Sequence, residues 1–152
     1  VYGNGRDMTT VIRSAEAAQQ ASRYSTVPIV REKLVAQQRA LAAHGGIVME
    51  GRDIGTVVCQ NALLKVFLDA SPAERARRRA ADLGIAPESP EVARIAQDIA
   101  ERDARDQSRA HSPLRRAPDA IHIDTTQIEI HDVVARLQEL VRQRMASLAS
   151  HG

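Results

Sequence analysis

The sequence predicts an α/β fold in which helices cover both faces of a parallel sheet, giving three layers. Two short segments, 47–50 and 64–69, are almost continuously apolar, as expected for parallel strands buried on both faces. The segments around these strands are rich in alanine, glutamine and arginine and have the composition of helices. With 152 residues, of which 43% are hydrophobic, the chain is expected to form one compact unit with its own core.

The amino-terminal part is expected to contain a tight turn and two helices. The Gly-Asn-Gly run at 3–5 indicates the turn, with a short strand after it. The alanine- and glutamine-rich run 14–24 predicts a helix with Ser14 as its N-cap. A second helix is expected to begin at Pro28 and to end at 44–46, which reads His-Gly-Gly. Its apolar stripe consists of Ile29, Val30, Leu34, Val35 and Leu41.

A polar turn follows the first predicted strand. It carries Glu50, Gly51, Arg52 and Asp53. Because α/β proteins present charged groups to ligands at the carboxyl ends of parallel strands, this turn predicts a ligand site. After the second strand, Ser71, Pro72 and Glu74 have the pattern of a capping box and predict a third helix through Ala81.

The remaining segments predict a loop, two helices and a last strand. Residues 82–92 hold a glycine and two prolines and are expected to form an exposed loop or lid. A helix over 90–109, a polar linker over 111–119 and a strand over 120–124 are expected to follow. The terminal helix, 130–148, is expected to pack through an apolar face formed by Val133, Val134, Leu137, Leu140, Val141 and Met145.

The composition excludes several function classes. The single cysteine, Cys59, rules out a disulfide framework or a cysteine-rich metal site and fits a reducing compartment. No apolar stretch approaches the ~20 residues that span a bilayer and no signal peptide opens the chain, so a cytoplasmic location without membrane contact is expected. An aromatic content of 2% argues against base stacking and hence against a nucleic-acid partner.

Arginines form two clusters at helical spacing. Arg75 and Arg79 lie four residues apart with Arg78 beside them, so like charges are held close together. The second cluster consists of Arg102, Arg105, Asp106 and Arg109, and Glu101 and Asp103 are expected to lie off its face. Either cluster alone is also consistent with a solvated face whose ion pairs contribute about 0.3 to 0.5 kcal/mol each.

Both clusters together, with the turn at Arg52 and Asp53, favour a site for a nucleotide or polyphosphate. Phosphoryl transfer depends on positioning and on neutralising the charge of the transferring group, and arginines that close from a lid supply that charge. The spacing therefore indicates a cationic, closable site without identifying the nucleotide.

Four segments of the chain carry a family resemblance. GRDIGTVV, LKVFLDASPAERARRRA and ERDARDQSRAHSPLRRAPDAIHIDTT occur in this order, downstream of IRSAEAAQQASRYSTVPIVREKLVAQQRAL. The first three resemble the core and carboxyl half of the bacterial cytidylate kinases, and the upstream run resembles the family's inserted nucleoside-monophosphate domain. The resemblance covers essentially all 152 residues and implies the P-loop fold of nucleoside-monophosphate kinases.

The same resemblance divides the chain into regions. Residues 1–46 correspond to the nucleoside-monophosphate-binding region and 47–81 to core strands and a helix. Residues 82–92 correspond to the lid loop, and 93–152 to the rest of the lid and the carboxyl-terminal part of the core.

The resemblance also implies roles for individual residues. Ser22, Arg31 and Asp53 match residues that contact the cytosine base, whose carbonyl, ring nitrogen and amine they can read together. Arg52 matches a residue near the acceptor phosphate. Asp106 would accept from the ribose hydroxyls, with Arg102 and Arg109 beside it. The arginines near the ATP phosphates would be Arg75, Arg78 and Arg79, and those with a catalytic role Arg52, Arg75, Arg79 and Arg102.

The implied reaction transfers the γ-phosphate of ATP, with Mg²⁺, to CMP or dCMP, in an enzyme expected to be a monomer. The family's glycine-rich loop, G-x-x-x-x-G-K-S/T, occurs nowhere in these residues. The chain is therefore expected to be a fragment without that loop and its strand, inactive on its own, with no metal ligands of its own. The missing strand would lie between those at 47–50 and 64–69 and leave unpaired edges.

Other functions remain open at this point. A small kinase with another acceptor, such as shikimate or adenylate, has the same phosphate requirements. A noncatalytic nucleotide- or RNA-binding remnant would use the arginines electrostatically and lose affinity steeply with salt. A partial gene without function is the third alternative.

Overall fold

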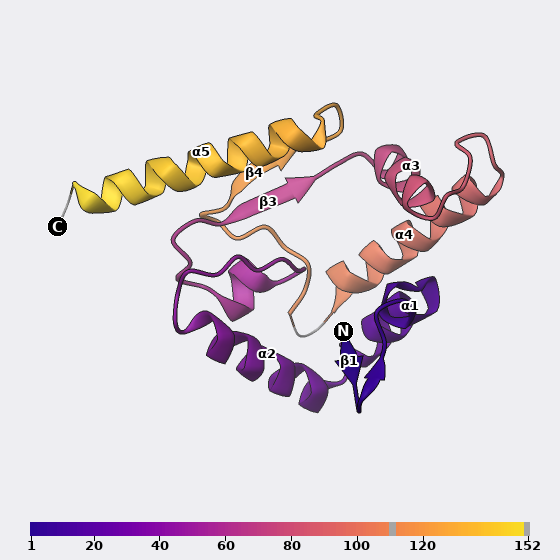
Figure 1. Ribbon diagram of the computed structural model, residues 1–152, viewed down its shortest axis with the longest axis horizontal. Helices are drawn as coiled ribbons and strands as arrows, with labels where there is room; N and C mark the ends of the chain where they lie inside the picture. The colour runs from indigo at the N-terminus through magenta and orange to yellow at the C-terminus, as the bar shows by residue number, and fades with distance from the viewer. Residues whose placement is uncertain (110–111, 151–152) are drawn as a thin grey trace.

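The computed structural model describes residues 1–109 and 112–150. Its centre is a two-stranded parallel sheet of β3 (Val66–Asp69) and β4 (Ile121–Asp124), paired from Val66 opposite Ile121 to Asp69 opposite Asp124. Helices α3 (Pro72–Asp82) and α4 (Glu91–Ser108) connect the two strands (Figure 1). The predicted α/β class and the parallel pairing are confirmed.

A β-hairpin opens the chain. Strands β1 (Tyr2–Gly3) and β2 (Arg6–Asp7) pair in antiparallel fashion. The turn residues Asn4 and Gly5 have φ angles of 50° and 77°, a conformation that Asn-Gly tolerates well. The predicted turn is thus confirmed. A short 3₁₀ turn, Val11–Arg13, leads into the first helix.

The two helices of the amino-terminal part form as predicted. In α1 (Ala15–Tyr24), the Ser14 hydroxyl accepts a hydrogen bond from the Ala17 amide at 3.1 Å, so Ser14 is the N-cap. Helix α2 (Pro28–Ala42) begins at its proline. Of the apolar stripe expected on α2, only Val35 is buried, and most of that stripe stays accessible to solvent.

The prediction of a strand at 47–50 is wrong. This segment is irregular, its backbone makes no hydrogen bond within the described residues, and Val48 is 97% exposed. A strand needs a neighbour to satisfy its backbone, and no described strand lies beside this segment. The chain instead forms one short π-helix, Ile54–Val58, which is tied to α2 by a hydrogen bond from Arg39 Nη2 to the Val57 carbonyl at 2.7 Å.

Helices α3 and α4 pack against each other beside the sheet. The Ser71 hydroxyl caps α3 by accepting from the Glu74 amide at 3.3 Å, but the reciprocal half of the predicted capping box is absent. The Ser71 amide donates to Thr126 Oγ1 instead, and the Glu74 carboxylate accepts from Arg77 and Arg78. The core is small and lies around the sheet and α3, where Val58, Ala70, Ala76, Ala80, Ala117 and Ile123 are buried.

The last helix, α5 (Ile130–Ala149), contradicts the expectation of an ordinary packing helix. Its apolar face is only half covered, and none of its residues is fully buried. Residues 110–111 and 151–152 lie outside the described residues. Residue 111 belongs to the predicted linker 111–119, and all four belong to the predicted region 93–152. Within the described chain, none of the helices has the length and apolarity required to cross a membrane.

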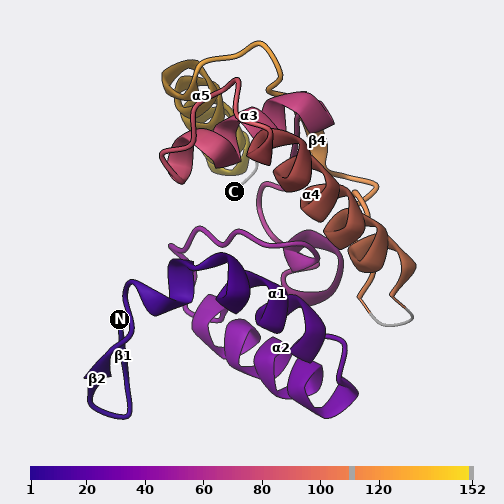
Figure 2. The same cartoon turned by 90° about the vertical axis from the view of Figure 1, so that its right-hand side faces the viewer.

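In Figure 2, α1 and α2 form the lower part of the molecule, and the sheet with α3, α4 and α5 forms the upper part. The carboxyl-terminal end of α4 extends down toward α1. At this junction Arg109, which directly follows α4, donates from Nη2 to the Ser22 carbonyl of α1 at 3.4 Å.

Candidate functional site

Helix α4 supplies the centre of the site. Its apolar side, which includes Ile95 and Ile99, continues along the helix into two aspartates, Asp103 and Asp106. Both aspartates are buried, and Asp106 is only 1% exposed. Carboxylates in such positions require charged or hydrogen-bonding partners.

Asp106 lies among three guanidinium groups. Arg52 Nε is 3.3 Å from Asp106 Oδ2, Arg102 Nε is 3.9 Å from the same oxygen, and Arg109 Nη2 contacts Oδ1. The structure thus brings together four residues that the sequence had assigned to the acceptor side. One carboxylate cannot balance three guanidiniums, so the centre carries excess positive charge.

The pKa of Arg102 is lowered first by burial and then by neighbouring positive charge. Burial lowers the pKa of the Arg102 guanidinium, and the positive charges of Arg52 and Arg109 lower it further, while Asp106 and Asp103 oppose the shift. A bound anion would relieve the repulsion among these cations.

Asp103 also belongs to the site, contrary to the sequence-based expectation that it lies off the arginine face. Its Oδ1 accepts from Arg52 Nη1 at 3.2 Å, and its Oδ2 contacts Arg75 Nη1. The expectation failed because it considered only the face through 102, 106 and 109. The available signal was the spacing of three between Asp103 and Asp106 on the extension of an apolar stripe.

Arg31 and Asp53 form a separate buried ion pair between α2 and the turn that follows it. Asp53 is 5% exposed, and Arg31 Nε is buried without a hydrogen-bond partner in the described chain. On α1, the carbonyl of Ser22 accepts from Arg109 Nη2 at 3.4 Å, while the buried Ser22 hydroxyl has no partner there either. Ser22 is thereby connected to Asp106 through Arg109.

The three arginines of α3 that the sequence assigned to the site, Arg75, Arg78 and Arg79, behave differently from one another. The ion pairs of Asp103 and Asp106 form one network with Arg52, Arg102 and Arg109, and Arg75 joins this network through its contact with Asp103. Arg78 donates one hydrogen bond to the Glu74 carboxylate and another, of 3.0 Å, to Thr125 Oγ1. Hydrogen bonds from Arg77 and Arg78 hold the pKa of Glu74 at about 2. Arg79 is half-buried, and its guanidinium makes no hydrogen bond or ion pair with any residue the structure describes.

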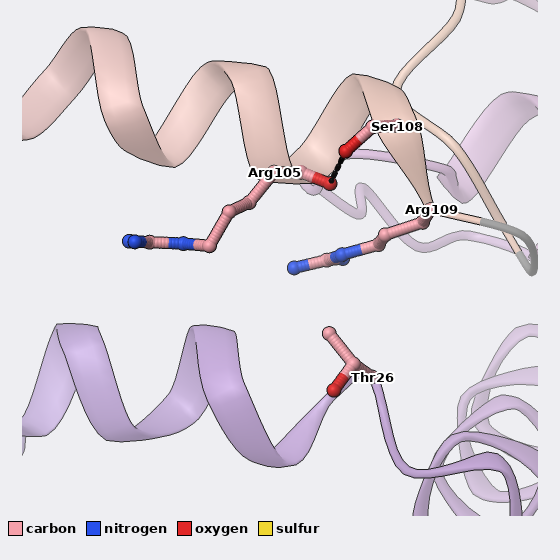
Figure 3. Close-up of a pocket in the computed structure, with 4 residues that line it drawn as sticks. All are labelled: Thr26, Arg105, Ser108 and Arg109. Carbon is pink, nitrogen blue, oxygen red and sulfur yellow. Dashed lines mark hydrogen bonds between the residues drawn. The ribbon is translucent and has the colours of Figure 1, made fainter.

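A small cavity adjoins the site. It has a volume of about 230 Å³ and is lined by Thr26, Arg105, Ser108 and Arg109. Figure 3 shows Arg105 and Arg109 extending from α4 on the side that faces the end of α1, where Thr26 lies. Arg105, expected on the face of Asp106, lines this cavity instead, and its side chain makes no ion pair with a described residue. Only Arg109 is shared between the cavity and the network.

The described residues hold no group of three or more histidine, cysteine, aspartate or glutamate side chains placed to bind a metal ion. The sequence-based expectation that the chain has no metal ligands of its own stays a prediction.

The fold and the site define an α/β protein with an arginine-rich site suited to a phosphorylated ligand. The sequence model of the family described as cytidylate kinase matches residues 1–143. The chain therefore belongs to the cytidylate kinase family, which confirms the resemblance found in the sequence.

Curated relatives agree with this assignment. The cytidylate kinase of Geobacillus thermodenitrificans is 47% identical over 146 residues, which cover 95% of this chain and 65% of the relative. That of Geobacillus sp. WCH70 is 49% identical with the same coverage. That of Mycoplasma pneumoniae is 48% identical over 143 residues, 93% of this chain and 66% of the relative. The chain thus spans about 65% of the length of these relatives.

Proposed function

We propose that this chain forms the acceptor-binding, lid and carboxyl-terminal parts of an enzyme that transfers the γ-phosphate of ATP to CMP or dCMP. The observation that carries the proposal is the buried Asp106 with Arg52, Arg102 and Arg109 around it. Membership of the cytidylate kinase family supplies the substrate class. The proposed role in pyrimidine nucleotide metabolism follows from that substrate.

The acceptor side accounts for the unsatisfied polar atoms of the site. A buried polar atom without a partner costs about 1 to 3 kcal/mol, so the Ser22 hydroxyl and Arg31 Nε favour a ligand that completes them. We assign these two groups and Asp53 to the cytosine base. Asp106 would accept from the ribose hydroxyls while Arg52, Arg102 and Arg109 neutralise the acceptor phosphate.

The donor side is assigned to the arginines of α3. Arg75 and Arg79 would neutralise charge on the transferring phosphoryl group, together with Arg52 and Arg102 from the acceptor side. Arg79 supports this assignment because its guanidinium has no described protein partner. Arg78 is proposed for the same phosphates, although it is held by Glu74 and Thr125. The described residues do not fit a Mg²⁺ site, so we assign no step to the metal.

We infer that the glycine-rich phosphate loop lies in the part of the relatives that this chain does not match. No G-x-x-x-x-G-K-S/T sequence occurs in the 152 residues, and the parallel sheet described here leaves one edge of β3 unpaired. The regions 1–46, 47–81, 82–92 and 93–152 keep their proposed identities as acceptor region, core, lid loop and carboxyl-terminal part. A monomer in the cytoplasm is proposed for the whole enzyme.

An acceptor panel tests the proposal. We define the extended chain as this sequence joined to the part of the G. thermodenitrificans cytidylate kinase that it does not match. With ATP as donor, its kcat/KM for CMP or dCMP is expected to exceed that for AMP and shikimate by about a hundredfold or more, because a site built from hydrogen-bonding groups rejects ligands that leave them unpaired. A preference for AMP or shikimate would assign the chain to another acceptor. Salt-sensitive RNA binding without turnover would favour a noncatalytic protein.

Arg31→Ala in the extended chain is expected to raise the KM for CMP by about 10- to 100-fold, because a hydrogen bond to a charged group contributes about 1.5 to 3 kcal/mol. The KM for ATP should change little. Lys33→Ala is the control, since Lys33 is exposed on the same helix without an ion pair among the described residues. Equal increases in both KM values would remove Arg31 from the cytosine site.

A further inference from the structure

We propose that Asp103 is a positioning residue that fixes the acceptor-side Arg52 relative to the donor-side Arg75. This inference rests on the proposed function for the roles of the two arginines. It rests on the structure for the contacts themselves. Asp103 is the described residue whose carboxylate joins these two arginines.

The three residues come from three different segments. Asp103 lies on α4, Arg75 on α3 and Arg52 in the turn before the π-helix. Each carboxylate oxygen of Asp103 contacts one arginine. Oδ1 contacts Nη1 of Arg52, and Oδ2 contacts Nη1 of Arg75. A single side chain therefore bridges the two guanidiniums.

Each of these guanidiniums is also held at a second nitrogen. Arg52 Nε lies 3.3 Å from Asp106 Oδ2, and Arg75 Nε donates to the Ala70 carbonyl at 3.2 Å. Two contacts fix the plane of a guanidinium as well as its position. The Nη2 of each arginine makes no hydrogen bond within the described residues, and both side chains are about one-third exposed, at 37% and 32%. Both Nη2 groups are thus available to phosphate oxygens.

The charge balance explains why a carboxylate is needed at this position. Two guanidiniums that share one small site repel each other, and the ionised Asp103 between them offsets that repulsion. When nucleotides bind, the same carboxylate keeps the two arginines near the acceptor and donor phosphates. Because phosphoryl transfer depends on positioning, a small change in the separation of these groups lowers the chemical rate more than it weakens binding.

The kinetic test uses Asp103→Asn in the extended chain. Its kcat is expected to fall by about a hundredfold, the effect of a misplacement of about 1 Å, while the KM values for CMP and ATP rise by no more than about threefold. Asp103, unlike Asp106, is assigned no contact with a substrate group, and loss of its negative charge adds no repulsion toward the phosphates, so the effect should appear in kcat. Asp98→Asn is the matched control, because Asp98 is an exposed aspartate of α4 without an ion pair in the described chain.

A double variant distinguishes positioning from a general structural role. If Asp103 acts through Arg75, Asp103→Asn should lower kcat only slightly further when Arg75→Ala is already present. Effects that multiply, or a kcat loss that follows the fraction of unfolded protein in thermal melts, would overturn the proposal.

A measurement on the 152-residue chain keeps this inference separate from the proposed function. In NMR spectra of arginine side chains, Asp103→Asn is expected to shift the Nε–Hε signals of Arg52 and Arg75 but not that of the exposed Arg94. Unchanged signals of Arg52 and Arg75 would overturn the link whatever the enzyme's activity. Shifted signals with no CMP phosphorylation by the extended chain would uphold the link and refute the proposed function.

Discussion

Asp106→Asn in the extended chain is expected to lower kcat/KM for CMP by about a hundredfold to a thousandfold. The substitution keeps the shape of the side chain but removes the charge that balances Arg52, Arg102 and Arg109. Each hydrogen bond between the charged carboxylate and a ribose hydroxyl contributes about 1.5 to 3 kcal/mol, and 1.36 kcal/mol corresponds to a factor of ten, so loss of one or two such bonds gives an effect of this size. Most of the loss should appear in the KM for CMP, because the proposed partner of Asp106 is the acceptor ribose.

Steady-state kinetics with either nucleotide varied would check this expectation. The KM for ATP should change by less than about threefold, since the three arginines at Asp106 include none from α3. Asp98→Asn should leave both KM values unchanged, and a thermal melt of each variant would show that folded enzyme is being compared. If both KM values rose equally, Asp106 would not belong to the acceptor site.

Local signals in the sequence predicted most of the secondary structure. The Ser14 N-cap, the proline at the start of α2 and the Ser71 N-cap each mark a helix start that the structure confirms. These signals work because a cap or a fixed φ angle acts within one turn of the chain. Strands β3 and β4 were also predicted, since their short apolar runs lie between clear helix signals.

Expectations that depended on distant neighbours were less successful. The apolar run 47–50 has the composition of a strand, but a strand requires a partner to pair with its backbone, and the described chain provides none. The apolar stripes of α2 and α5 were read correctly as amphipathic, yet most of their residues are not fully buried. Periodicity indicates which face can be buried and does not show what covers it.

The predictions for the site also succeeded where they depended on local spacing and failed where they depended on distant packing. Spacing placed Arg102, Arg105, Asp106 and Arg109 on one face. The structure brings Arg102, Asp106 and Arg109 together with Arg52, but Arg105 lines the neighbouring cavity and makes no ion pair with a described residue. The spacing did not reveal the contact of Asp103 with Arg52 and Arg75, because that contact depends on how α3 packs against α4. The base assignments of Ser22, Arg31 and Asp53 came from family resemblance alone and stay predictions.

The 152-residue chain on its own is expected to bind CMP and yet form CDP at less than about one thousandth of the rate of the extended chain. The acceptor network is present in these residues, with Asp106 and its three arginines already in contact. The family's loop, whose backbone amides and lysine hold the ATP phosphates, is absent from them. Removal of one preorganised donor alone costs about 10²- to 10³-fold in rate, and the loop supplies several.

Two measurements on the same preparation would test both halves of this expectation. Calorimetric titration with CMP should show binding to the chain, and Asp106→Asn should weaken it strongly while Asp98→Asn should not. A coupled assay with CMP and ATP should then show negligible CDP formation. CDP formation at a rate near that of the extended chain would mean that these residues hold a complete site for the ATP phosphates. Failure of the folded chain to bind CMP would mean that the acceptor network also needs the unmatched part of the relatives.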